Sequence, residues 1–205
     1  ADLGDDESGE GNDWTENNIT ATNDQMLDSP TNNFCVLNPL NSYDEIQSGT
    51  EPTMNFYEGN LKVDSEEPSS VSWWPAVGSL AVPSGKWYWE WLYVSDNGTI
   101  NGVMNSSNAE VADKFDCGTM YRASNGYKYV DGYGTSSSYG ATWAAGDIIG
   151  VALDADADTV VFYKNNVSQG SIALGTNTKG SGSFQPVFWL ADEAVITANF
   201  GQDSS

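Results

Sequence analysis

The chain has 205 residues, enough for one domain with a substantial core, and its 29 acidic and seven basic side chains give a formal net charge of -22. Such a negative surface repels nucleic acid and anionic membranes, and there is no apolar run of about 18 residues to insert into a bilayer. The chain has no histidine, which excludes Ser-His-Asp and Cys-His nucleophiles and any zinc site built on histidine.

Residues 1–30 are predicted to form an extended acidic arm or linker ahead of the folded domain. The first 18 residues, ADLGDDESGEGNDWTENN, contain seven acids and no base, and their only large apolar side chains are Leu3 and Trp14. Such a segment buries too little surface to offset its loss of conformational entropy. We therefore expect it to be ordered only where it docks onto another surface.

Residues 31–203 are predicted to form one all-β domain, because short apolar runs alternate there with Gly, Asn, Ser, Asp and Pro. Strands are expected in FCVLNPL, MNFYEGNLKV, GSLAVPS, GKWYWEWLYV, GYKYV, GDIIGVALD, TVVFYKNN, GSIAL, FQPVFWL and AVITANF. Hairpin turns are expected at DNG (96–98), SNG (124–126) and NNV (165–167). Only residues 106–115 have the pattern of a helical turn or loop. Many short strands with almost no helix indicate a β-sandwich or a barrel.

Residues 119–143, TMYRASNGYKYVDGYGTSSSYGATW, are predicted to form a binding surface. Antibody loops use the same residue types, because tyrosine supplies rigid contact area and serine and glycine supply adaptable hydrogen bonding. The candidate ligand-binding residues are Arg122, Tyr127, Tyr129, Tyr133 and Tyr139, and we expect Tyr133 and Tyr139 to be exposed. The alternative is a hairpin and loop whose tyrosines pack locally.

Asp154, Asp156 and Asp158 form the pattern D-A-D-A-D, which resembles the start of a calcium loop. Thr159 and Asn165 stand where that loop requires Gly and Glu, so a solvated acidic turn is favoured over a metal site.

The sequence shows no recognisable catalytic constellation. The chain lacks histidine and a recognisable pair of carboxylates for glycoside hydrolysis, so we expect no catalytic residues, no cofactor and no enzymatic activity. Cys35 and Cys117 either pair or remain two buried thiols.

Five segments occur in a recognisable order: GKWYWEW (85–91), YRASNG (121–126), GDIIGVALDADADTVVFYKNN (146–166), FQPVFWL (184–190) and NFG (199–201). Together they resemble the SPRY family, the core of B30.2 domains. The resemblance implies a concanavalin-like, bent sandwich of two antiparallel sheets. It also implies protein recognition through loops at one end of the sandwich, without catalytic residues.

The alternating tryptophans of GKWYWEWLYVS (85–95) raise the question of whether they bind a ligand or fill a core. The SPRY pattern places Trp89 inside the sandwich. Alternate residues of a strand share a face, so the resemblance implies that Trp87 and Trp91 are also at least partly buried. Trp143 and Trp189 are expected in the core as well.

The segments GNDWTENNIT, DSPTNNFCVLNPL and EGNLKV are similar to the lead-in of SPRY-like modules in virion proteins of tailed bacteriophages. This similarity implies an extracellular, non-enzymatic module on a virion surface, in a tail fibre or a capsid-associated fibre. Its partners would be other virion proteins, a host-surface glycan or a host-surface protein. We expect a homo-oligomer, with the acidic arm as its attachment segment.

Three other functions remain open. A secreted carbohydrate-binding module predicts an exposed aromatic row. A hydrolase on a lectin-like sandwich predicts two carboxylates in a cleft. A structural subunit of a cell-surface filament predicts an arm or strand shared between neighbouring copies.

Overall fold

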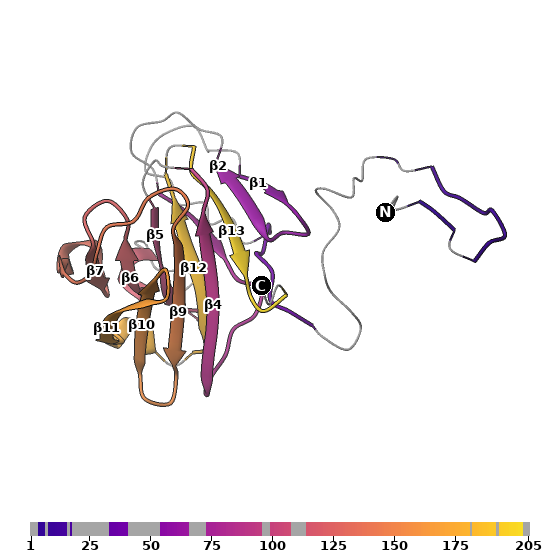
Figure 1. Ribbon diagram of the computed structural model, residues 1–205. Helices are drawn as coiled ribbons and strands as arrows, with labels where there is room; N and C mark the ends of the chain where they lie inside the picture. Colours follow the sequence, from indigo (N-terminus) through magenta and orange to yellow (C-terminus); the bar gives the residue numbers. More distant parts are fainter. Residues whose placement is uncertain are drawn as a thin grey trace.

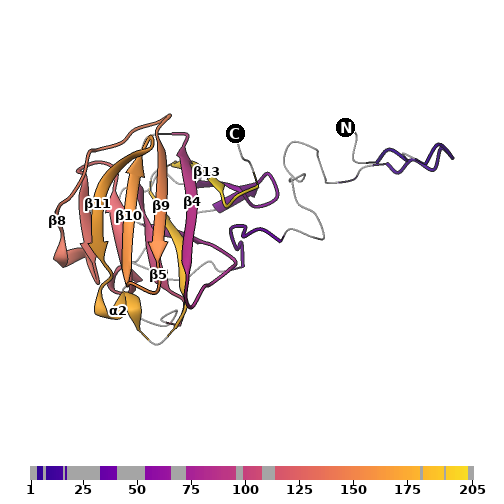
Figure 2. The same ribbon diagram turned by 60° about the horizontal axis from the view of Figure 1, so that its bottom comes forward.

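The chain folds into two antiparallel sheets that pack face to face (Figures 1 and 2). The computed structural model describes residues 4–6, 8–15, 17, 33–40, 54–65, 73–95, 99–107, 114–180, 182–191 and 193–202. Within these ranges the helical segments are single turns: η1 (Lys114–Cys117), η2 (Tyr133–Thr135) and α2 (Thr176–Lys179). The predicted all-β sandwich is therefore confirmed.

Over the described residues, the first sheet has seven strands and the second has six. In spatial order the first contains β1 (Met54–Tyr57), β2 (Lys62–Ser65), β13 (Val195–Asn199), β4 (Lys86–Tyr93), β9 (Ile148–Asp154), β10 (Thr159–Lys164) and β11 (Val167–Ala173). The second contains β3 (Trp74–Val77), β12 (Phe184–Leu190), β5 (Thr99–Asn105), β6 (Gly118–Arg122), β7 (Tyr127–Val130) and β8 (Ser137–Ser138). Figure 2 shows β4, β9, β10 and β11 side by side across the front of the molecule.

Two of the three expected hairpins are confirmed. Asn165 and Asn166 join β10 to β11 with φ values of 47° and 66°, as a two-residue turn with left-handed backbone requires. Gly126 joins β6 to β7 with φ of 68°. The DNG segment (96–98) lies outside the described residues, but its flanking strands β4 and β5 belong to different sheets. The hairpin expected there is wrong.

Several strand boundaries differ from the predictions. MNFYEGNLKV forms two strands, β1 and β2, because Glu58, Gly59 and Asn60 take positive φ values and reverse the chain. FCVLNPL and GSLAVPS contribute only the isolated bridges Leu37–Gly78 and Val82–Phe184. The sequence patterns also missed β3, β5 and β6. Strand β5, TINGVMN, is buried along its whole length, so it lacks the alternation of polar and apolar residues that marks a half-buried strand.

The main core lies between the two sheets. Trp89 and Trp91 of β4 are buried in it, as expected. The Trp91 ring lies 5.2 Å from the Phe188 ring and 5.5 Å from the Phe200 ring, centroid to centroid. Trp143 is also buried in this core. These aromatic contacts join β4 of the first sheet to β12 of the second.

A second hydrophobic cluster lies on the other face of the six-stranded sheet. Along β12, Phe184, Phe188 and Leu190 belong to the main core, whereas Val187 and Trp189 alternate with them and belong to the second cluster. Trp189 is therefore buried as predicted, but outside the space between the sheets. Both faces of this sheet are buried over β12 and β5.

The described part of the arm is a local loop rather than an extended segment. The backbone N–H of Trp14 donates to the Gly4 carbonyl over 2.8 Å, and the backbone N–H of Asp6 donates to Oδ1 of Asp13 over 3.0 Å. The Asp6 carboxylate accepts hydrogen bonds from the backbone N–H groups of Ser8 and Asn12. The loop lies apart from both sheets in Figures 1 and 2.

Among the described residues there is no helix that combines the length and the hydropathy needed to cross a membrane.

Candidate functional site

The tryptophan row of β4 runs from the core to the surface. Trp91 is fully buried and Trp89 is 4% exposed, but Trp87 keeps 47% of its surface exposed. Trp87 stands one residue inside the start of β4, and its indole N–H donates to the Ser84 carbonyl over 2.8 Å. The inner end of the row fills the core as expected, while Trp87 forms part of a surface pocket.

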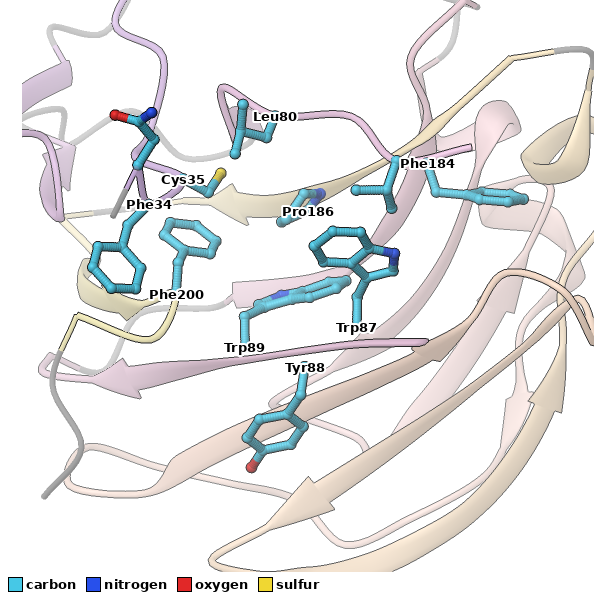
Figure 3. Close-up of a pocket in the computed structure, with 11 residues that line it drawn as sticks. Phe34, Cys35, Leu80, Trp87, Tyr88, Trp89, Phe184, Pro186 and Phe200 are labelled. Atoms are coloured by element: carbon cyan, nitrogen blue, oxygen red, sulfur yellow. The ribbon is translucent and has the colours of Figure 1, made fainter. Parts of the chain in front are cut away.

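This pocket, here called the Trp87 pocket, has a volume of about 200 Å³. Figure 3 shows Trp87 and Trp89 rising from β4 toward Pro186 and Leu80, whereas the Tyr88 ring points to the opposite face. Segments far apart in the sequence build the walls, which contain Asn33, Phe34, Cys35, Leu80, Val82, Trp87, Tyr88, Trp89, Phe184, Pro186 and Phe200.

The chemistry of the Trp87 pocket favours binding of an apolar group. None of its lining residues carries a formal charge at neutral pH. Burial raises the pKa of the Cys35 thiol, which leaves it a poor nucleophile. Cys35 is not joined by a disulfide to Cys117, which lies in the second hydrophobic cluster. Among the described residues, the pocket therefore has no acid, base or activated nucleophile.

Four of the five predicted ligand-binding residues gather on the outer face of the six-stranded sheet. Arg122 ends β6, Tyr127 and Tyr129 alternate along β7, and Tyr133 stands in η2. Trp73, which sequence reasoning missed, completes what we call the Arg122 surface. Its position just before β3, far away in the sequence, gave no signal that it would reach Arg122.

The guanidinium of Arg122 is held between aromatic rings. Its carbon Cζ lies 5.1 Å from the centre of the Trp73 ring and 5.9 Å from that of Tyr133. Nη1 donates to the Tyr133 hydroxyl over 2.7 Å and to the Tyr129 hydroxyl over 3.4 Å. The Tyr129 and Tyr133 rings stack at 5.2 Å. Tyr129 is buried, whereas Tyr127 and Tyr133 are exposed, so the surface has a fixed base and an accessible rim.

Arg122 is the only arginine of the chain, and within the described ranges it forms no ion pair with a carboxylate. Its Nε atom is buried and has no hydrogen-bond partner there. Burial lowers the pKa of the guanidinium, but contacts with Tyr129 and Tyr133 offset this and leave the pKa raised. The group is therefore a permanent cation with unused capacity to donate hydrogen bonds.

Tyr139 does not join this surface, and the expectation that it is exposed is wrong. Its ring packs against Tyr121 at 5.0 Å and Phe162 at 6.1 Å, at the end of the main core. Its hydroxyl donates to the Gly170 carbonyl over 2.5 Å and accepts from the Phe162 N–H over 3.3 Å. Tyr139 thus satisfies backbone groups of β10 and β11, while the preceding Ser137 and Ser138 of β8 are exposed.

The D-A-D-A-D segment forms the turn between β9 and β10. Its three carboxylates point to different partners: Asp154 pairs with Lys86 at 3.0 Å, Asp158 pairs with Lys179 at 3.6 Å, and Asp156 accepts from the Gly85 N–H. Over the part of the chain that the structure describes, no three His, Cys, Asp or Glu side chains are grouped to hold a metal ion.

Comparisons with known proteins identify the architecture. The family model described as SPRY domain matches residues 86–203. The E3 ubiquitin-protein ligase RKP of Arabidopsis thaliana is 38% identical over 64 residues, which are 31% of this chain and 5% of that protein. The chain therefore corresponds to a small part of this relative.

Two solved structures share the fold. The crystal structure of the SPRY domain of human HERC1 has a TM-score of 0.63 at 19% identity, over 82% of this chain and 99% of that one. The stonustoxin structure has a TM-score of 0.58 at 17% identity, over 80% of this chain and 27% of that one. At these identities the two structures support the fold alone.

Proposed function

Because the chain belongs to the SPRY domain family, we propose that it is a non-enzymatic recognition module that binds another protein through the Arg122 surface. The observation that carries this proposal is which side chains contact the Arg122 guanidinium. The chain has 29 acids, but the described residues that hold its only arginine are tyrosines and a tryptophan, with no carboxylate among them. A carboxylate supplied by a partner would complete its hydrogen bonding.

The chemistry of the surface defines the partner. Charge-assisted hydrogen bonds from a guanidinium to a carboxylate contribute about 1.5–3 kcal/mol each, and flanking tyrosines add rigid contact area. The net charge of -22 repels strongly acidic proteins at long range. The best partner is therefore a neutral or basic protein that presents one Asp or Glu side chain at the contact.

Selection from a displayed peptide library tests this proposal. We expect the immobilised chain to select peptides that share an acidic residue, and Arg122→Gln to weaken their binding at least tenfold. Lys86→Gln is the matched control, since it removes one positive charge on the other sheet and should change binding less than twofold. Peptides that bind the wild type and Arg122→Gln equally would rule out the Arg122 surface.

Two of the alternative functions, a carbohydrate-binding module and a hydrolase, have less support. A carbohydrate-binding module needs an exposed aromatic row, but Trp89 and Trp91 are buried. A hydrolase needs two carboxylates in a cleft, whereas none of the described residues that line the Trp87 pocket is charged. Binding of glycans by the chain, unaffected by Arg122→Gln, would favour the first alternative instead.

We also propose a setting for this module, on the surface of a tailed-bacteriophage virion, as an oligomeric component of a fibre. The similarity of the leading segments to virion modules supports it, although residues 16, 18–20 and 28–32 of these segments lie outside the described ranges. The high negative charge suits a soluble, exposed protein. Antibodies against the chain should label the surface of purified particles, and labelling confined to host cells would contradict this setting.

A further inference from the structure

We propose that the Trp87 pocket binds the Trp14 side chain from the arm of a second copy of this chain. The inference rests on the proposed assembly of copies, and it names the contact that joins them. It does not involve the Arg122 surface, which uses other residues on the outer face of the six-stranded sheet.

The pocket has the size and lining of a site for one aromatic side chain. Its volume of about 200 Å³ is below the roughly 300–1,000 Å³ of small-molecule sites. Phe34, Trp87, Trp89 and Phe200 contribute aromatic rings to its walls, and such rings favour edge or offset contacts with another ring (Figure 3). Trp87 and Leu80 each keep 47% of their surface exposed, so the mouth of the pocket is an apolar surface open to a partner.

The arm presents an exposed aromatic side chain that suits the Trp87 pocket. Trp14 is 82% exposed, although the backbone around it is fixed by the hydrogen bonds of the 4–15 loop. Gly9 and Gly11 take φ values of 83° and 69°, which lets this acidic loop close tightly. An aromatic residue on a pre-formed loop loses little conformational entropy when it binds, which is a property of interface anchors.

The connection between the arm and the sandwich places the two features within reach of each other. The chain enters the sandwich at Asn33, Phe34 and Cys35, which are themselves walls of the pocket. Residues 18–32 could extend ~55 Å between Asn17 and Asn33. In this structure the chain's own Trp14 remains exposed and its loop lies apart from the sandwich, so we assign the pocket to the arm of a neighbour. A reciprocal exchange of arms would make a closed dimer with two equivalent contacts.

Charge sets the salt dependence of this contact. Each copy carries a net charge of -22, so two copies repel each other, while the contact itself buries apolar rings. Added salt screens the repulsion and leaves the apolar contact intact. Self-association should therefore strengthen as the salt concentration rises, which is opposite to the behaviour of an interface held by ion pairs.

Sedimentation of the full-length chain tests the proposal. We expect the wild type to dimerise with rising concentration, and Trp14→Ala and Leu80→Asp to raise the dissociation constant roughly 30-fold or more, as loss of an anchor residue does. Asn17→Ala, an exposed change in the same arm, and Val167→Asp, an exposed apolar site on β11, should both behave as wild type.

Mixing the two weakened variants tests whether the contact joins different copies. The Leu80→Asp chain retains Trp14, and the Trp14→Ala chain retains the pocket, so their mixture should form a heterodimer with one intact contact. A wild type that remains monomeric would overturn both assembly and this contact. If Leu80→Asp still dimerises while Trp14→Ala does not, the arm binds elsewhere. If Trp14 is protected from quenching in a monomer, it occupies its own pocket, and the assignment to a second copy is wrong.

Discussion

Replacing Trp91 by alanine tests the assignment of the tryptophan row to the core. A buried Trp removes 150–250 Å² from water, which at about 25 cal/mol per Å² corresponds to roughly 4–6 kcal/mol. Its ring contacts with Phe188 and Phe200 add about 0.5–1.5 kcal/mol each. Its indole N–H is buried without a hydrogen-bond partner among the described residues. Removing that group relieves a desolvation penalty and so offsets the loss of stability by about 1–3 kcal/mol. We therefore expect Trp91→Ala to lower the free energy of unfolding by about 3–5 kcal/mol.

Trp87→Ala is the matched change on the same face of the same strand. Trp87 keeps 47% of its surface exposed, so its replacement by alanine removes only about half of the burial free energy of a tryptophan. We expect it to lower the free energy of unfolding by ~2–3 kcal/mol. Both variants should be made in a Trp14→Ala background, so that self-association does not contribute to their stability.

Urea unfolding followed by circular dichroism measures both variants. If Trp91→Ala does not fold, Trp91→Phe supplies the comparison, because it keeps one ring against Phe188 and removes the unpaired N–H. We expect it to cost less than about 2 kcal/mol. An equal loss of stability in Trp87→Ala and Trp91→Ala would refute the assignment of these two tryptophans to rim and core.

Three further changes test other parts of the structure. Gly102→Ala should prevent folding or cost at least about 3 kcal/mol, because the new Cβ would overlap the backbone of β6; Gly134→Ala, with open space around it, should be close to neutral in the same unfolding assay. Asp131→Ala should cost about 1–3 kcal/mol, because its carboxylate accepts hydrogen bonds of 2.8 Å from two backbone N–H groups of α2; urea unfolding would show no loss if these bonds contribute nothing. For Asp147, burial raises the pKa, but hydrogen bonds and the 3.0 Å ion pair with Lys164 lower it below 3.8 overall. The Asp147 carboxylate therefore contributes its full stabilisation above pH 3.8, the ordinary pKa of the group, and loses it as the pH falls through the lower pKa of the folded state. Asp147→Asn should be less stable than wild type at neutral pH, and the difference should shrink below pH 3.8; a difference that stays constant with pH would contradict this account.

The sequence by itself determined the fold class and the inner part of the core. A strand places alternate residues on one face, so assigning Trp89 to the interior also assigned Trp91, wherever the strand lay in its sheet. The turns at Gly126 and Asn165 could also be predicted from the sequence, because positive φ is a local requirement that few residue types meet. The family resemblance followed from the same residues, since the recognisable motifs are those that build the sandwich.

Only the tertiary structure decided which side chains face solvent and which meet across the fold. Alternation does not say which side chains on one face of a strand are covered by other segments, so it did not reveal that Trp87 stands half exposed at the rim. Composition marked Tyr133 and Tyr139 alike, but in the folded chain Tyr139 is half-buried and packs against the main core. Trp73 reaches Arg122, and the Trp87 pocket closes, only because strands distant in the sequence become neighbours. These contacts depend on sheet order and register, which are set by the burial of the whole chain at once and not by any local pattern.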